Sequence, residues 1–104
     1  MTHCQLLTSL KVSEDSGILL EWYVTQIVQR VIGESEEPVT FTISDNQTML
    51  SEERPDEACA LINIKASKEL SMAQLELLKK EFYPVVKRFL NLSQDNVRVD
   101  YQKI

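Results

Sequence analysis

Apolar and polar residues alternate with a period of two in four stretches of the chain and recur with a helical period in two longer ones. Alternation places successive side chains on opposite faces of a strand, and it predicts strands over residues 4–12, 39–44, 58–67 and 97–102. Apolar spacings of three and four predict helices over residues 18–32 and 72–89. The predicted order of elements is therefore strand, helix, strand, written twice.

Residues that favour helix ends flank both helical patterns. The run Ser13-Glu14-Asp15-Ser16 offers a cap and first-turn acids before the first helix, and Gly33 suits its carboxyl end. Ser71 with Gln74 three residues later fits a capping box at the start of the second helix. These signals place the helix boundaries.

A short internal repeat supports a duplication. Leu10-Lys11-Val12-Ser13 repeats as Ile64-Lys65-Ala66-Ser67, and each copy ends an apolar run that a helical pattern follows. We expect one domain over residues 1–104, with a first β-α-β unit at 1–44, a connecting loop at 45–57 and a second β-α-β unit at 58–104.

Every predicted strand has one apolar side, and two amphipathic helices are present to cover it. The expected fold is α+β with two layers, in which both helices cover one face of a four-stranded mixed sheet. The uncovered face would be largely polar yet carry Leu7 and Leu61, which suits a surface partly covered by neighbouring subunits; its polar members are Ser9, Lys11, Thr40, Thr42, Asn63, Lys65, Arg98 and Asp100. Ferredoxin-like domains, including ligand-binding regulatory modules, share the order of elements and remain an alternative.

Composition excludes several classes of function. The net charge is −5, with 16 acids against 11 bases, and a chain without a basic stripe is a poor nucleic-acid binder. We find neither a charged-then-apolar leader nor an apolar run of about 18 residues, so we expect a cytoplasmic protein without membrane contact. Metal-ligand spacings, phosphate loops and catalytic triads are missing from the sequence, so no metal or cofactor is expected.

The second half of the chain carries the motifs of a known family. Cys59-Ala60-Leu61 and the run Leu90-Asn91-Leu92-Ser93-Gln94-Asp95-Asn96-Val97-Arg98-Val99-Asp100-Tyr101 resemble the tautomerase superfamily, in its macrophage migration inhibitory factor branch. The resemblance extends over nearly the whole chain, because the duplication and the unit lengths agree. It implies a homotrimer in which three sheets wrap a barrel, the helices lie outside, and pockets form between adjacent subunits.

The sequence departs from that family at its catalytic residue. The family uses an amino-terminal proline as the base, whereas Thr2 stands here behind Met1. If Met1 were removed, Thr2 would expose a primary amine of pKa about 7.7 to 8, which can act as a general base, and its hydroxyl resembles amino-terminal threonine nucleophiles.

Other family features also change. An acid replaces the family's lysine after the first helix, near Gly33-Glu34-Ser35, and Arg98 stands where close relatives have a pocket tyrosine. Cys59 is not followed by a second cysteine two residues on, and the chain stops at Ile104 without the carboxy-terminal segment that lines the pocket in that branch.

Two basic residues of the polar sheet face, Lys65 and Arg98, are candidates for binding a small carboxylate, together with Ser67. Arginine offers a planar fork and lysine a point charge. The alternative, which we favour, is that both pair with Asp100 and with acids of neighbouring subunits across a trimer interior.

The remaining candidates have simple structural interpretations. His3 is the only histidine, and beside a chain terminus it is expected to be solvated or to cap a backbone group. Trp22 and Tyr23 are expected in the core or in a subunit contact. Cys4 and Cys59 are expected to be inert core thiols.

Three functions follow. The favoured one is a tautomerase-superfamily protein without proline-dependent activity, retained as a trimeric binding or interaction scaffold. The first alternative is an active tautomerase that acts on a small 2-keto acid or unsaturated carboxylate with a non-proline base. The second is a ferredoxin-like module that binds a small ligand.

Overall fold

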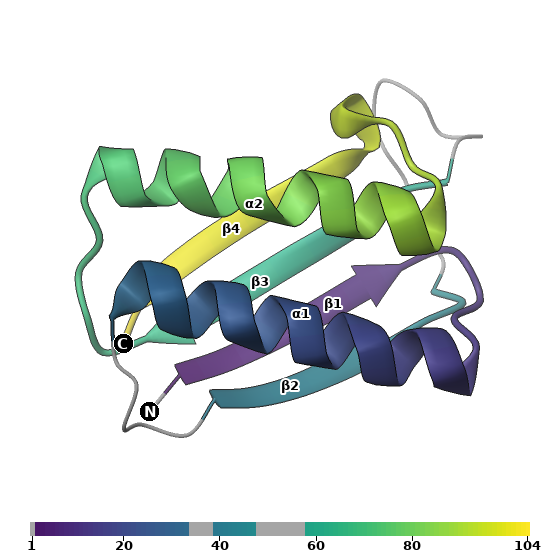
Figure 1. Ribbon diagram of the computed structural model, residues 1–104, viewed down its shortest axis with the longest axis horizontal. Coiled ribbons are helices and arrows are strands. Elements are labelled where there is room, and N and C mark those ends of the chain that lie inside the picture. Colours follow the sequence, from purple (N-terminus) through teal and green to yellow (C-terminus); the bar gives the residue numbers. More distant parts are fainter. Residues whose placement is uncertain (1, 34–38, 48–57) are drawn as a thin grey trace.

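The computed structural model describes residues 2–33, 39–47 and 58–104. In these segments the elements are β1 (Thr2–Thr8), α1 (Glu14–Ile32), β2 (Val39–Ser44), β3 (Ala60–Ala66), α2 (Met72–Leu90), a 3₁₀ turn (Gln94–Asn96) and β4 (Val97–Lys103). The strands form one sheet in the order β2-β1-β3-β4, and both helices lie side by side on one of its faces (Figure 1). The predicted two-layer α+β fold is confirmed.

The strand pairing separates the two fold hypotheses. β1 pairs in parallel with β2, β3 pairs in parallel with β4, and the antiparallel pairing of β1 with β3 joins the two units into a mixed sheet. A ferredoxin-like domain has a split β-α-β unit, whose two strands are not neighbours. Here the strands of each unit are hydrogen-bonded neighbours, so the ferredoxin-like alternative is wrong.

The duplication is present in the fold, but the sequence repeat used to detect it is in the wrong register. Each element of the second unit begins 58 positions after its counterpart, as Thr2 and Ala60, Glu14 and Met72, and Val39 and Val97 show. The repeat of residues 10–13 at 64–67 has an offset of 54. The first strand therefore ends earlier than predicted, and Lys11 does not belong to the sheet face.

Side-chain hydrogen bonds explain this early end of β1. The hydroxyl of Thr8 accepts the backbone N–H of Leu10 at 3.2 Å, and the carboxylate of Asp45 accepts the backbone N–H of Val12 at 2.9 Å. Both N–H groups are thus satisfied outside the strand ladder. Leu10 and Val12 still pack against the core, which is why the alternating pattern continues beyond the strand.

The predicted helix caps are confirmed. The hydroxyl of Ser13 accepts the N–H of Ser16, and Gly33 ends α1 in the left-handed region at φ 78°. Ser71 and Gln74 form the reciprocal capping box at the start of α2. In the second unit Asn91, at φ 55°, takes the place of the glycine.

The core lies between the helices and the covered face of the sheet. Leu20, Val24 and Val28 of α1 and Leu78, Phe82 and Val86 of α2 are among its fully buried members. Leu19, Trp22 and Met72 lie outside the core of the single chain, with exposed fractions of 47%, 57% and 73%. Of the two places expected for Trp22, the core is therefore excluded and a subunit contact stays a prediction.

Several predictions fall outside the described residues. These are the state of Met1, the acid at position 34 that replaces the family's lysine, and most of the connecting loop at 45–57. In the part of the chain that is described, no helix has the length and apolar character needed to cross a bilayer.

Candidate functional site

The uncovered face of the sheet is organised in three rows of side chains that run across the four strands. The register places Thr40, His3, Lys65 and Gln102 in the first row, Thr42, Gln5, Asn63 and Asp100 in the second, and Ser44, Leu7, Leu61 and Arg98 in the third. Two rows are wholly polar, and the third contains the two leucines. This face offers hydrogen-bonding groups and charges on a rigid support.

The first row contains the lone histidine. Nδ1 of His3 lies 2.6 Å from the hydroxyl of Thr40, and Lys65 is the cross-strand partner of His3 on its other side. His3 is thus tied to a neighbouring strand and stays exposed. The first and second rows line a shallow hollow of about 370 Å³, whose wall consists of His3, Cys4, Gln5, Thr40, Thr42, Asn63 and Lys65.

The second and third rows end in a charged pair on the edge strand β4. Nε of Arg98 donates to Oδ1 of Asp100 at 3.1 Å, and the Arg98 side chain is 78% exposed. The expected pairing of Arg98 with Asp100 is therefore present. Within the described segments the structure gives Arg98 no other partner, so its terminal nitrogens can receive a carboxylate.

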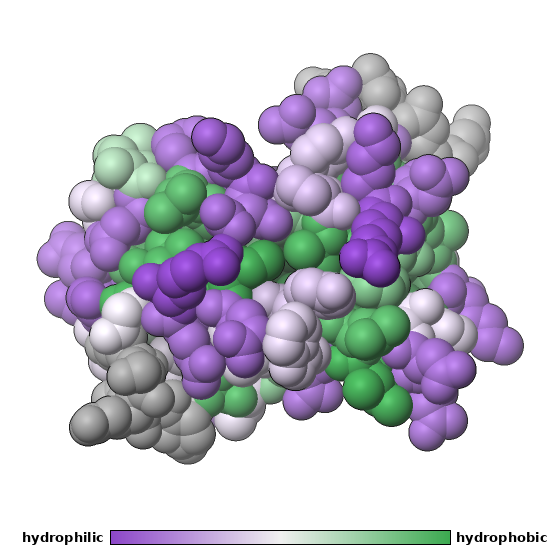
Figure 2. Space-filling model, viewed as in Figure 1, coloured by the Kyte–Doolittle hydropathy of each residue, from purple (hydrophilic) through white to green (hydrophobic). Residues whose placement is uncertain are grey.

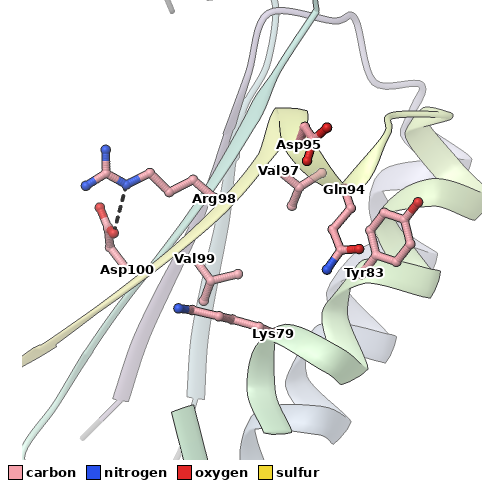
Figure 3. Close-up of a pocket in the computed structure, with 8 residues that line it drawn as sticks. All are labelled: Lys79, Tyr83, Gln94, Asp95, Val97, Arg98, Val99 and Asp100. Atoms are coloured by element: carbon pink, nitrogen blue, oxygen red, sulfur yellow. Dashed lines mark hydrogen bonds and ion pairs between the residues drawn. The ribbon is translucent and has the colours of Figure 1, made fainter. Parts of the chain in front are cut away.

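A second hollow, of about 450 Å³, wraps around β4 (Figure 3). Arg98 and Asp100 lie on one side of the strand, while Val97 and Val99 point to the side where Lys79 and Tyr83 project from α2. Asp95 lies at its upper end, and the side chain of Gln94 extends toward Tyr83. The hollow thus joins the charged pair to a partly apolar cleft between α2 and the strand.

The structure does not bring the predicted carboxylate ligands together within one chain. Lys65 is opposite Gln102 on β4, and Arg98 lies four residues before Gln102, which corresponds to about 13 Å along the strands. Ser67 follows the end of β3 and is exposed. Lys65 and Arg98 of one chain are thus not neighbours on the sheet.

Thr2 lies on the opposite face of the sheet from these two residues. It begins β1, and its side chain is 2% exposed on the face that the helices cover. Its hydroxyl is thus enclosed by protein in the described structure. Only the backbone amine, if Met1 is removed, could act on a ligand from this position.

The two cysteines differ in their surroundings. Cys4 is 2% exposed, and burial raises the pKa of its thiol to about 12, because the charged thiolate would lose its hydration. Cys59 is half-buried just before β3. The prediction of an inert core thiol is thus confirmed for Cys4, whereas Cys59 lies at the border of the core.

One cluster at the amino-terminal end of β1 was missed by the sequence analysis. Nζ of Lys68 donates to the carbonyl of Ile32 at 2.5 Å, and the phenol of Tyr101 donates to the carbonyl of Lys68. A lysine of the β3–α2 connection thus lies at the carboxyl end of α1. Lys103 of β4 lies 4.0 Å from Glu69, the residue that follows Lys68 in the sequence. These contacts join residues more than 30 positions apart, for which the sequence gives no local signal.

Two comparisons with known proteins, one with family models and one with solved structures, agree with each other. The family model described as macrophage migration inhibitory factor (MIF) matches residues 3–104. The fold is similar to that of Leishmania major MIF2, with a TM-score of 0.89 and 13% identity over 100% of this chain and 89% of that one. It is also similar to the Toxoplasma gondii factor, with a TM-score of 0.86 and 14% identity over 98% and 89% of the two chains. A search of curated proteins by sequence gives no match.

The described residues contain no cluster of three or more histidine, cysteine or acidic side chains that could hold a metal ion. What this part of the chain offers chemically is a set of cations, amides and hydroxyls on an exposed sheet face. Such groups bind and orient a small anion.

Proposed function

The chain belongs to the macrophage migration inhibitory factor family, and on this basis we propose that it forms a homotrimer that binds a small carboxylate between subunits without proline-dependent tautomerase chemistry. The observation that carries the proposal is the separation of Lys65 from Arg98 on one sheet face. Each residue alone provides half of a carboxylate site. Two chains are needed to bring the halves together.

The composition of the uncovered face supports an oligomer. Leu7 and Leu61 are cross-strand partners in the third row, and both are only half-buried in the single chain. A face that mixes paired leucines with amides and hydroxyls suits a contact that is partly apolar and partly hydrogen-bonded. In the family that this chain resembles, the same face lies inside the trimer.

The charges at the two ends of the face support a site between chains. Among the described residues Arg98 contacts only Asp100, through Nε, and this contact leaves its terminal nitrogens for a bidentate contact. Lys65 is exposed at the other end, beside His3. In a cyclic trimer every contact is heterologous, so one end of one sheet can meet the other end of the next.

The chemistry at position 2 supports a binding role over catalysis. The family's base is an amino-terminal proline, and this chain has Thr2, whose hydroxyl is buried. The nearest thiol on the same strand, Cys4, stays protonated because burial raises its pKa to about 12. Neither side chain provides a base at neutral pH.

An enzymatic alternative has one specific observation in its favour. Lys68 places an ammonium group at the carboxyl end of α1, where this family has a lysine and this sequence has Gly33 and Glu34. With Met1 removed, the Thr2 amine could act as a base near such a cation. The residues implied for that reaction are Thr2, Lys68 and Arg98.

A keto–enol exchange assay with phenylpyruvate separates the two functions. The chain is purified, the state of Met1 is determined by mass spectrometry, and the rate is compared with that of buffer. The proposal predicts no rate above buffer with Met1 present or removed. A rate above buffer that is lost in Arg98→Ala would establish the enzymatic alternative instead.

A complementation experiment tests the site itself. The probe is phenylpyruvate, and its binding is measured by calorimetry for Lys65→Met, Arg98→Met and a mixture of the two chains unfolded and refolded together. Each variant alone should bind at least about tenfold more weakly than the wild type, because one charged contact is lost.

The mixture should regain wild-type affinity at about a quarter of its sites, since random assembly of a cyclic trimer pairs an intact Lys65 with an intact Arg98 at that frequency. Asp100→Asn is the matched control, and it should bind at least as tightly as the wild type because it removes a competing carboxylate. A mixture that regains no site contradicts a site shared between chains.

A further inference from the structure

The amino-terminal half of α1 carries apolar side chains that point away from the core. Ile18, Leu19 and Trp22 are 61%, 47% and 57% exposed, and they are neighbours on the helix surface. We call these three residues the α1 patch. Figure 2 shows hydrophobic surface over this half of α1, on the side of the molecule that the helices cover. Exposed apolar residues are ordinary one by one, whereas a group of adjacent ones marks an interaction surface.

The α1 patch borders a shallow depression. A hollow of about 360 Å³ is lined by Ile18, Glu21, Trp22, Thr25 and Gln26. The indole of Trp22 is held in place edge-to-face on Tyr23, with ring centroids 4.9 Å apart and an interplanar angle of 84°. The ring of Tyr23 in turn packs against the ring of Phe89 of α2, with centroids 5.8 Å apart. The wall of the hollow is thus fixed to the rest of the molecule.

Negative charge flanks the α1 patch along α1. Glu14, Asp15 and Glu21 are exposed on the same part of the helix, and they lie three or four positions from Ile18. The first basic residue of α1 is Arg30, which pairs with Glu81 at 2.6 Å near the other end of the helix. The surface therefore combines an apolar centre with acids along α1, which we call the acidic rim. On the α2 side, Arg88 lies over the ring of Phe89, which packs against Tyr23.

This combination selects the class of partner. A second copy of the same surface would place acids against acids, which disfavours a symmetric contact between two chains. A basic amphipathic helix has the complementary pattern, with apolar residues three or four positions apart and flanking lysines or arginines. The patch also lies on the helical side of the molecule, opposite the uncovered sheet face, so both surfaces can be occupied together (Figure 1).

We propose that the α1 patch binds a basic amphipathic helix of a partner protein. A bulky apolar side chain of that helix occupies the hollow beside Trp22, and its basic residues pair with Glu21 and Asp15. Apolar burial supplies affinity, and the acidic rim selects basic partners over neutral or acidic ones. The site is independent of the ligand site on the sheet.

Trp22 is the only tryptophan of the chain, so its fluorescence reports directly on this surface. The probe is a synthetic helical peptide of leucine and lysine with amphipathic spacing, titrated into the full chain. We expect a saturable blue shift of the Trp22 emission. The affinity should fall at least about tenfold in Ile18→Asp and in Glu21→Lys, because each removes a contact in the centre or rim of the interface. Leu77→Asp, at a 42% exposed leucine of α2, is the matched control and should leave the affinity unchanged.

Three results would overturn the proposal. One is the lack of a blue shift with the peptide at about 1 mM, a concentration that exceeds the dissociation constant of even weak specific contacts. Another is binding that does not depend on the acidic rim, seen either as equal binding of a leucine–glutamate peptide or as an unchanged affinity in Glu21→Lys. The third is a blue shift that depends on the concentration of the chain alone, which would make a second copy the occupant. Circular dichroism of each variant shows whether it is folded, so that a missing blue shift of the Trp22 emission is not attributed to binding when the variant has unfolded.

Discussion

The two glycines of the chain lie at different places on α1, one inside the helix and one at its carboxyl end. Replacing each with alanine should change the free energy of unfolding in opposite directions. Gly33 ends the helix at φ 78°, where its N–H donates to the carbonyl of Gln29, and alanine is strained in this conformation. Gly17 lies inside the helix. A methyl group there would meet Ile43 Cδ1 at 3.5 Å and Val12 Cγ1 at 3.9 Å, which are ordinary contacts.

The magnitudes follow from these geometries. Gly33→Ala should lower the free energy of unfolding by about 1 kcal/mol, the cost of a left-handed alanine. Gly17→Ala should raise it by about 0.5 to 1 kcal/mol, since alanine has the better helix propensity and the site has room. The two variants should differ by about 1.5 to 2 kcal/mol, which corresponds to roughly 6 to 16 °C in the midpoint of thermal unfolding for a domain of this size.

Urea unfolding followed by circular dichroism at one fixed protein concentration measures these differences, because the stability of an oligomer depends on concentration. Gly33→Asn is the matched control. Asparagine tolerates the left-handed region and occupies the equivalent position at Asn91 of the second unit, so it should cost less than alanine. The reasoning is refuted if alanine at position 33 is as stable as glycine, or if Gly17→Ala destabilises the chain.

Three further changes test the core, the buried thiol and the missed lysine. Phe82→Ala should lower the free energy of unfolding by about 3 to 5 kcal/mol in the same assay, because Phe82 is fully buried, and a loss below about 1 kcal/mol would place it outside the core. The thiol of Cys4 has a pKa of about 12 against an ordinary 9.0, so the native state keeps a proton that the unfolded state loses, and stability should fall between pH 9 and 12 by up to about 1.4 kcal/mol per pH unit. Cys4→Ala should remove that part of the alkaline slope, and an unchanged slope would contradict the assignment. Lys68→Met should speed hydrogen exchange in the last turn of α1 by about two- to fivefold, because Lys68 binds the Ile32 carbonyl, whereas Lys80→Met should have no such effect.

The fold could be predicted from the sequence wherever one periodicity fitted one element. Val97, Val99 and Tyr101 alternate with polar residues, and the strand found there has those bounds to within a residue. The boundary of β1 was missed because Leu10 and Val12 continue the alternation while they pack on the core from a connection. Period-two patterns report burial, and they do not distinguish a strand from a segment whose N–H groups are bound by side chains.

The candidate site was predictable in its residue types and less so in its geometry. The sequence placed Lys65 and Arg98 on one face correctly, but their separation depends on the register of β3 and β4. Lys68 was missed because its contact with Ile32 joins the two units, and no local pattern specifies it. Trp22 was expected in the core or in a subunit contact because an aromatic residue near a helical stripe is usually buried, and the single chain leaves it 57% exposed.

The most direct test of the account is the molar mass of the chain in solution, measured by light scattering behind a sizing column. If two sheets complete each ligand site, the measured mass should be three times that of the 12.0 kDa chain. Loss of that mass in Leu61→Asp, with helix content retained, would place the uncovered sheet face in the contact. A chain that remains a monomer at micromolar concentration would contradict the shared site, because Lys65 and Arg98 would then have no neighbouring subunit to bring them together.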